Sequence, residues 1–167
     1  MKLDEFLPVY DFSERHEMTV KSTREQAYDA LSKVDFSESF ILRILFQLRG
    51  LKTGKFKDLE KSFTLLSNDL PQEIVLGLIA RPWTPKGQTL AFQKEEFKGF
   101  NAPNYAKLAW NFTFKNSPQG TIVSTETRIY CTDTSSRRKF SFYWFFVRPF
   151  SGLVRLEIFK LLRKKLN

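Results

Sequence analysis

Residues 135–166 read SSRRKFSFYWFFVRPFSGLVRLEIFKLLRKKL, and this stretch decides the fold. Its apolar residues recur every three or four positions, which places them along one flank of a helix. They are Phe140, Tyr143, Trp144, Val147, Phe150, Val154, Ile158, Leu161 and Leu162. Phe142, Phe145, Phe146, Leu153 and Leu156 widen this stripe until the first half of the helix is apolar nearly all round. Such a helix is normally buried, so we expect strands to cover it.

The chain upstream of this helix offers one kind of partner, a series of strand-like segments rich in Phe, Trp, Ile and Val. The clearest is 106–115, where apolar and polar residues alternate as in a strand with one buried face. A turn at 116–120 returns the chain into a second strand-like run, 121–132. The pattern predicts an α+β fold in which a curved antiparallel sheet wraps around the long C-terminal helix.

Local signals predict the remaining elements. Residues 15–22 alternate like a half-buried strand, with His16 on the apolar face. Thr23 and Gln26 have the spacing of a capping box, which opens a short helix. We further expect an ordered arm over 1–13, a second short helix over 37–48 stopped by Gly50, a loop over 53–61, a hairpin over 63–81 and turns at 84–88 and 101–104. A strand, two short helices, several strands and a long helix follow one another in the order of the helix-grip fold.

Length and composition bound the class of protein. At 167 residues the chain is expected to form one domain, 1–167, around a single core. The one cysteine, Cys131, has no partner for an intrachain disulfide, which favours a reducing compartment. The N-terminus lacks the apolar stretch of a secretory signal, and the apolar run 140–150 is too short to span a bilayer. We therefore expect a cytoplasmic protein.

Positive charge is concentrated in the last helix. Residues 134–167 hold nine Lys or Arg and one acidic residue, whereas the rest of the chain holds eighteen and seventeen. Four cations lie in the last turns of the helix, near the negative end of its dipole, namely Lys160, Arg163, Lys164 and Lys165. One interpretation is that they only solvate the end of the helix. The alternatives are transient contact with an anionic membrane, an acidic partner or nucleic acid, of which nucleic acid is not the expected one.

Short motifs carry a resemblance to a known superfamily over nearly the whole chain. They are Glu14-Arg-His16, Glu73-Ile-Val-Leu-Gly-Leu78 with Arg81 and Trp83, Glu96-Phe97, Tyr105-Ala-Lys107 with Trp110-Asn-Phe112, Thr125-Glu-Thr-Arg128, and Tyr143-Trp144 with Arg148-Pro-Phe-Ser-Gly152. With these motifs the chain resembles the START-like, or SRPBCC, superfamily, and within it polyketide cyclase-like proteins of a bacterial subfamily without established catalytic residues. The resemblance implies the helix-grip fold more strongly than it implies any reaction.

Eight residues are candidates for lining a ligand cavity. His16, the only histidine, could be a general acid or base, or a hydrogen-bonded core residue. Glu126 and Arg128 are two apart on a strand and share one face, as an ion pair or as an anchor for a polar ligand group. Which face they occupy is left open. The others are aromatic residues that carry a polar atom, namely Trp83, Tyr105, Trp110, Tyr143 and Trp144.

The predicted function is binding, with or without transport, of a hydrophobic small molecule or lipid between the sheet and the C-terminal helix. Its basis is the element order and the surplus of aromatic residues. The resemblance implies an alternative, a polyketide cyclase- or aromatase-like enzyme that acts in the same cavity. No Gly-rich phosphate loop, metal-ligand cluster or nucleophile elbow is visible, so we expect no cofactor or metal. Pro149 and the following Ser151-Gly152 are expected to bend the long helix.

Overall fold

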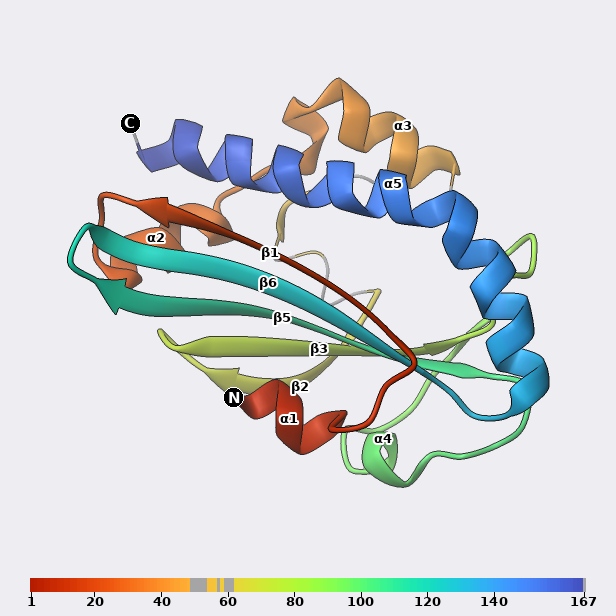
Figure 1. The fold of residues 1–167 in the computed structure, drawn as a ribbon. Helices are drawn as coiled ribbons and strands as arrows, with labels where there is room; N and C mark the ends of the chain where they lie inside the picture. Colours follow the sequence, from red (N-terminus) through yellow and green to blue (C-terminus); the bar gives the residue numbers. More distant parts are fainter. Residues whose placement is uncertain (49–53, 57, 59–61, 167) are drawn as a thin grey trace.

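The computed structural model describes residues 1–48, 54–56, 58 and 62–166, and over these ranges the predicted α+β helix-grip fold is confirmed. Figure 1 shows a curved antiparallel sheet crossed on one face by the long C-terminal helix. The elements are α1 (Lys2–Phe6), β1 (Phe12–Val20), α2 (Arg24–Ser32), the 3-10 turn η1 (Phe36–Glu38), α3 (Phe40–Leu48), β2 (Thr64–Asp69), β3 (Glu73–Ala80), β4 (Thr89–Leu90), α4 (Glu96–Gly99), β5 (Ala106–Ser117), β6 (Gly120–Cys131) and α5 (Thr134–Leu166).

The sheet has the order β1-β6-β5-β3-β2, with β4 beside β3. Its centre is the β5–β6 hairpin, which runs in register from Ala106 opposite Cys131 to Ser117 opposite Gly120. Gly120 has a φ of 125°, and a Cβ there would lie 2.2 Å from the carbonyl oxygen of Val20. Only glycine fits this turn, which brings the end of β1 against the start of β6.

Most of the predicted elements form within a few residues of their expected bounds. The capping box is present, because the Thr23 side chain accepts from the Gln26 amide and the Gln26 side chain accepts from the Thr23 amide. The second predicted helix is divided into η1 and α3 at Ser39, whose hydroxyl accepts from the Leu42 amide. Gly50 and most of the predicted loop 53–61 lie outside the described residues.

α5 holds the inner face of the sheet through two apolar clusters, one on either side of its bend. Its first half places Phe140 against Phe12 and Trp83 at one end of the sheet. Its second half packs against α2, α3 and the other end of the sheet through Ile158, Phe159, Leu161 and Leu162. The bend visible in Figure 1 lies in the part of α5 that contains Pro149, which cannot supply the backbone hydrogen bond of a regular helix.

The expectation that the first half of this helix is buried nearly all round is wrong. Phe142, Phe145 and Phe146 are 72%, 76% and 54% exposed, whereas Phe140 is 1% exposed. Phe150, Leu153 and Leu156 are exposed as well. The physical reason is that the sheet lies against one flank of α5, and the apolar residues of the opposite flank have no strand to cover them.

Two short helices cover the outer face of the sheet, the face away from α5. Apolar residues of α1 and α4, among them Leu3 and Phe97, form a separate cluster with Val75, Ile79 and Ala109 of the sheet. The amides of Lys2 and Leu3 donate to the buried carboxylate of Glu73 at 2.7 and 3.2 Å. The N-terminal arm is therefore ordered, as predicted, and it closes a second layer of core.

Candidate functional site

Buried and half-buried polar side chains gather at the middle of the inner face, where α5 bends. They come from β1 (Glu14 and His16), β6 (Thr127) and α5 (Ser151 and Arg155). We call these five residues the central cluster. Arg155 is only 4% exposed although it carries a charge, so its surroundings must supply both an opposite charge and hydrogen-bond acceptors.

The hydrogen bonds of the central cluster converge on Arg155. Its Nη1 donates to Glu14 Oε2 at 3.2 Å and to the hydroxyl and carbonyl oxygens of Ser151 at 2.6 and 2.8 Å. Its Nη2 donates to the Thr127 hydroxyl at 2.6 Å. The other oxygen of Glu14 lies 3.0 Å from His16 Nε2. One carboxylate therefore bridges a buried guanidinium and a partly exposed imidazole.

Strand and helix periodicity explain how the central cluster is assembled. Glu14 and His16 are two residues apart on β1, so both point to the inner face, and Thr127 is the register partner of Glu14. Ser151 and Arg155 are one helical turn apart on α5. Between them, Gly152 permits close contact, because a Cβ there would lie 3.1 Å from Glu14 Oε1. A larger residue there would require the Glu14 side chain to shift by a few tenths of an ångström.

The central cluster has chemical groups suited to recognising a polar ligand. A guanidinium binds carboxylate, phosphate or carbonyl oxygens, and an imidazole oriented by a carboxylate can exchange a proton. The His16 side chain is 28% exposed, so this ring is the member of the cluster nearest to solvent contact. Arg155 and Glu14 are much more enclosed.

The predicted cavity residues of the inner face fall into three places. His16 lies in the central cluster. Trp110 packs against Phe63 and Phe112 and donates from Nε1 to the Thr125 hydroxyl at 2.6 Å. The predicted candidates Trp83, Tyr143 and Trp144 pack around the Phe140 ring, near the start of α5. The structure therefore spreads these aromatic residues along the length of the sheet.

Glu126, Arg128 and Tyr105 lie on the outer face of the sheet and not beneath the helix, which decides the face that the sequence leaves open for Glu126 and Arg128. Arg128 Nε donates to Glu126 Oε1 at 2.7 Å, and its Nη1 donates to Asp4 of α1 at 2.8 Å. This guanidinium lowers the pKa of Asp4 through its hydrogen bond. Tyr105 packs against Phe100 on the same outer face. The pleat decides this, because Arg128 and Glu126 alternate with the inward-facing Thr127 and Thr125, and the pair anchors α1.

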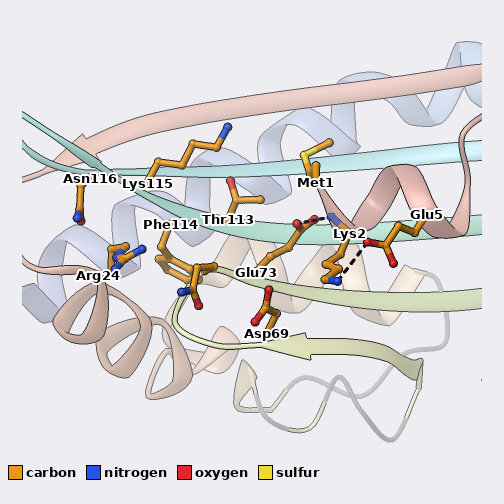
Figure 2. A pocket seen from close by; sticks show the side chains of 11 residues that line it. Met1, Lys2, Glu5, Arg24, Asp69, Glu73, Thr113, Phe114, Lys115 and Asn116 are labelled. Carbon is orange, nitrogen blue, oxygen red and sulfur yellow. Dashed lines mark hydrogen bonds and ion pairs between the residues drawn. The ribbon is translucent and has the colours of Figure 1, made fainter.

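Two surface hollows lie away from the interface of α5 with the sheet. One, of about 450 Å³, is lined by α1, the β2–β3 turn and the ends of β5 and α2, and Figure 2 shows its mixture of charged side chains, including Lys2, Glu5, Arg24, Asp69 and Lys115. The other, of about 390 Å³, lies against α4 and the segment before it. Neither hollow contains a residue of the central cluster, and the charged lining of the first does not match the predicted hydrophobic ligand.

The part of the chain that the structure describes contains neither a metal centre nor a membrane span. Within those ranges no three His, Cys, Asp or Glu side chains come together in a way that could hold a metal ion. None of the helices placed there has the length and apolar character needed to cross a lipid bilayer.

Some solved structures resemble this chain in fold, but their sequence identity to it is low. The sequence matches no protein-family model and no curated protein. Among solved structures, protein MLL2253 from Mesorhizobium loti is 12% identical with a TM-score of 0.46, over 93% of this chain and 96% of that one. The di-domain ARO/CYC BexL from the BE-7585A biosynthetic pathway is 14% identical with a TM-score of 0.39, over 99% of this chain and 53% of that one. TTHA0849 from Thermus thermophilus is 10% identical with a TM-score of 0.32, over 93% of this chain and 97% of that one. Likeness at this level identifies neither a ligand nor a reaction.

Of the five residues of the central cluster, only His16 is indicated as a site candidate by the sequence. Glu14 stood in a quoted motif without a role, although its spacing from His16 on an alternating strand is the signal that both face inward. Arg155 was counted among the cations of the helix. Its spacing of three and four from Ile158 and Phe159, both on the buried flank, is the signal that could have identified it as buried.

Proposed function

We propose that this protein is a START-like domain that binds a hydrophobic small molecule or lipid between the sheet and α5, with the polar group of the ligand at the central cluster. The observation that supports this most is the bridged set Glu14–His16–Arg155, which lies on an inner face that is apolar over most of its area. Buried charges of this kind are costly for stability and are therefore candidates for function.

The surroundings of the central cluster suit an amphiphilic ligand. Partly buried apolar residues lie near the cluster: Met18 is two residues from His16, Val154 precedes Arg155, and Trp110 is the register partner of Thr127. An acyl or ring system would contact these residues, while a carboxylate or carbonyl would replace one of the acceptors of Arg155. Neither of the two hollows described above lies between α5 and the sheet, and we propose that α5 moves away from the sheet when the ligand binds, with the bend at Pro149 as the hinge.

A titration with a dansyl-labelled fatty acid tests the proposal. We expect saturable binding at one site, with displacement by the unlabelled acid. Val154→Trp fills the space beside the central cluster and His16→Gln removes the ring that borders it, so each is expected to weaken binding severalfold. Glu17→Gln, on the exposed face of β1, is the matched control and is expected to bind like the wild type. Absence of saturable binding, or equal binding by all three variants, would refute the proposal.

The second candidate is an enzyme of the polyketide cyclase or aromatase type. It is favoured by the 3.0 Å contact between His16 Nε2 and Glu14, since a carboxylate that orients an imidazole is a common arrangement for proton transfer. The test is turnover of a poly-β-ketone thioester mimic, followed by absorbance of the aromatic product. Loss of turnover in His16→Gln with retained binding of the mimic supports this role, and unchanged turnover removes it.

A further inference from the structure

The outer flank of α5 carries an apolar strip that the fold does not use. We call it the α5 ridge, and its members are Phe142, Phe145, Phe146, Phe150, Leu153 and Leu156. Their exposed fractions run from 43% to 76%. Large apolar side chains scattered singly on a surface need no explanation, but six of them along one helical flank indicate a surface that meets an apolar partner.

Helix geometry separates the α5 ridge from the core. At 100° per residue, the ridge positions project away from the flank that holds Phe140, Arg155, Ile158 and Phe159 in the interior. Helix α3, which lies on the same side of the sheet as α5 in Figure 1, adds further exposed apolar residues, namely Phe40, Ile41 and Ile44. This side of the molecule is therefore more apolar than folding requires.

Cations stand at both ends of the α5 ridge. Arg138 and Lys139 precede Phe142 on the exposed surface, and Lys160 and Arg163 follow Leu156. Lys160 lies 3.6 Å from Glu157 but is 75% exposed, and Lys164 and Lys165 are paired with Glu38 at 3.3 and 2.7 Å, so part of the terminal cation cluster already has an acidic partner within the chain. The charge that an outside partner would meet is thus positive at each end of an apolar strip.

We infer that the α5 ridge is the surface by which this protein docks on an anionic lipid membrane. In such docking the Phe and Leu side chains enter the boundary between headgroups and acyl chains, and the flanking cations meet lipid phosphates. The helix lies on the membrane and does not cross it, in agreement with its mixed composition. The inference does not depend on what the interior of the protein binds.

A second copy of this chain is a poorer occupant of the α5 ridge. Two ridges packed antiparallel would place Arg138 of one copy against Lys160 and Arg163 of the other. Two ridges packed parallel would oppose each cation with its own copy. Like charges meet at both ends in either case, which destabilises the pair unless counter-ions intervene. An anionic lipid surface removes the same repulsion.

Vesicle sedimentation tests the inference directly. The wild-type chain is mixed at low ionic strength with vesicles of phosphatidylcholine alone or with a third of phosphatidylglycerol. We expect binding to the anionic vesicles to be stronger by roughly fivefold for each engaged cation, and to weaken near physiological salt. The double variant Phe145→Ser/Phe146→Ser is expected to lose at least about tenfold in partitioning, because two aromatic side chains no longer leave water.

Matched variants separate ridge, charge and general surface effects. Val9→Ser/Leu90→Ser removes two exposed apolar residues elsewhere and is expected to bind like the wild type. A triple variant with Glu at positions Arg138, Lys160 and Arg163 is expected to lose the preference for anionic vesicles. The control is a triple variant with Glu at Lys86, Lys94 and Lys115. It changes the net charge equally and is expected to have the smaller effect on binding. Equal binding by the ridge variant and the wild type overturns the inference. So does a solution dimer that the ridge variant converts to monomer, since a second copy would then cover the ridge.

Discussion

Removal of the charge at Glu14 is the sharpest test of the central cluster. Glu14→Gln keeps the shape of the side chain but removes the carboxylate charge that lies 3.2 Å from Nη1 of Arg155, a residue only 4% exposed. Breaking a buried ion pair by removing one partner costs about 3–5 kcal/mol in the free energy of unfolding. Ser151 and Thr127 still accept hydrogen bonds from the guanidinium, so we expect a loss near the lower bound, about 3 kcal/mol.

The same reasoning sets the expected result of a double-mutant cycle. Arg155→Met is expected to cost about 3 kcal/mol as well, since it leaves the Glu14 carboxylate without the guanidinium and only in contact with the His16 ring. The double variant removes both charges together, so it should cost about 2 kcal/mol less than the sum of the single variants. For a chain of this size, a loss of about 3 kcal/mol lowers the melting temperature by roughly 6–12 °C.

Urea unfolding followed by tryptophan fluorescence measures these free energies. The control is an ion pair on the same strand that faces solvent, Arg15 Nη2 with Glu17 Oε2 at 2.9 Å, both side chains being more than half exposed. Glu17→Gln is expected to change the free energy of unfolding by no more than about 0.5 kcal/mol. If Glu14→Gln costs as little as Glu17→Gln, Arg155 is not held by a buried carboxylate and the description of the cluster is incorrect.

Three further predictions address other parts of the structure. Phe140→Ala should lower the free energy of unfolding by about 3–5 kcal/mol, and Phe145→Ser by no more than about 0.5 kcal/mol, because only the first ring is buried; equal losses in urea unfolding would contradict this. Glu73→Ala should cost about 2 kcal/mol and increase deuterium uptake over residues 2–7, since Glu73 binds the first amides of α1; unchanged uptake would show that α1 is held otherwise. Burial, with the charge of Asp11, raises the pKa of Cys131 to about 12, so the native thiol should react with a disulfide reagent at pH 8 on the order of 100 times more slowly than the urea-unfolded chain. Because the folded pKa lies above the unfolded one, the stability that Cys131 contributes is present at neutral pH and is lost as the pH rises above about 9.

The fold could be predicted from the sequence because each element carries a strong local signal. The alternation in 106–115, the capping box of Thr23 and Gln26 and the apolar period of 135–166 correspond to β5, α2 and α5. Each of these signals comes from residues that are close together in the chain. It can therefore be recognised from the repeat of a strand or a helix alone. The division at Ser39 was missed because it depends on a hydroxyl that contacts both Leu42 and the distant Glu157.

The placement of polar residues was less predictable, because it depends on which face of the sheet is covered. An alternating strand shows that Glu126 and Arg128 share a face, but both faces of this sheet are covered, one by α5 and the other by α1 and α4. Buried polar residues on the outer face, such as Asn111, therefore resemble solvent-facing residues in the sequence. Likewise, the sequence does not show which flank of α5 meets the sheet. The exposed Phe residues of the α5 ridge and the buried Phe140 differ only in the flank on which they lie.

The pairing of β1 with β6 has a consequence for how the chain is made in the cell. Val20 and its partner Thr121 are about 100 residues apart in the sequence. The separation between Asp4 and its partner Arg128 is larger, at 124 residues. At a synthesis rate of about 5–20 residues per second, β1 leaves the ribosome roughly 5–20 s before its partner strand exists. During that interval its hydrogen-bonding edge is unpaired, which is the condition in which strands aggregate or recruit chaperones. This part of the sheet can therefore form only after β6 has been synthesised, and a chain interrupted before residue 120 would be a substrate for quality control.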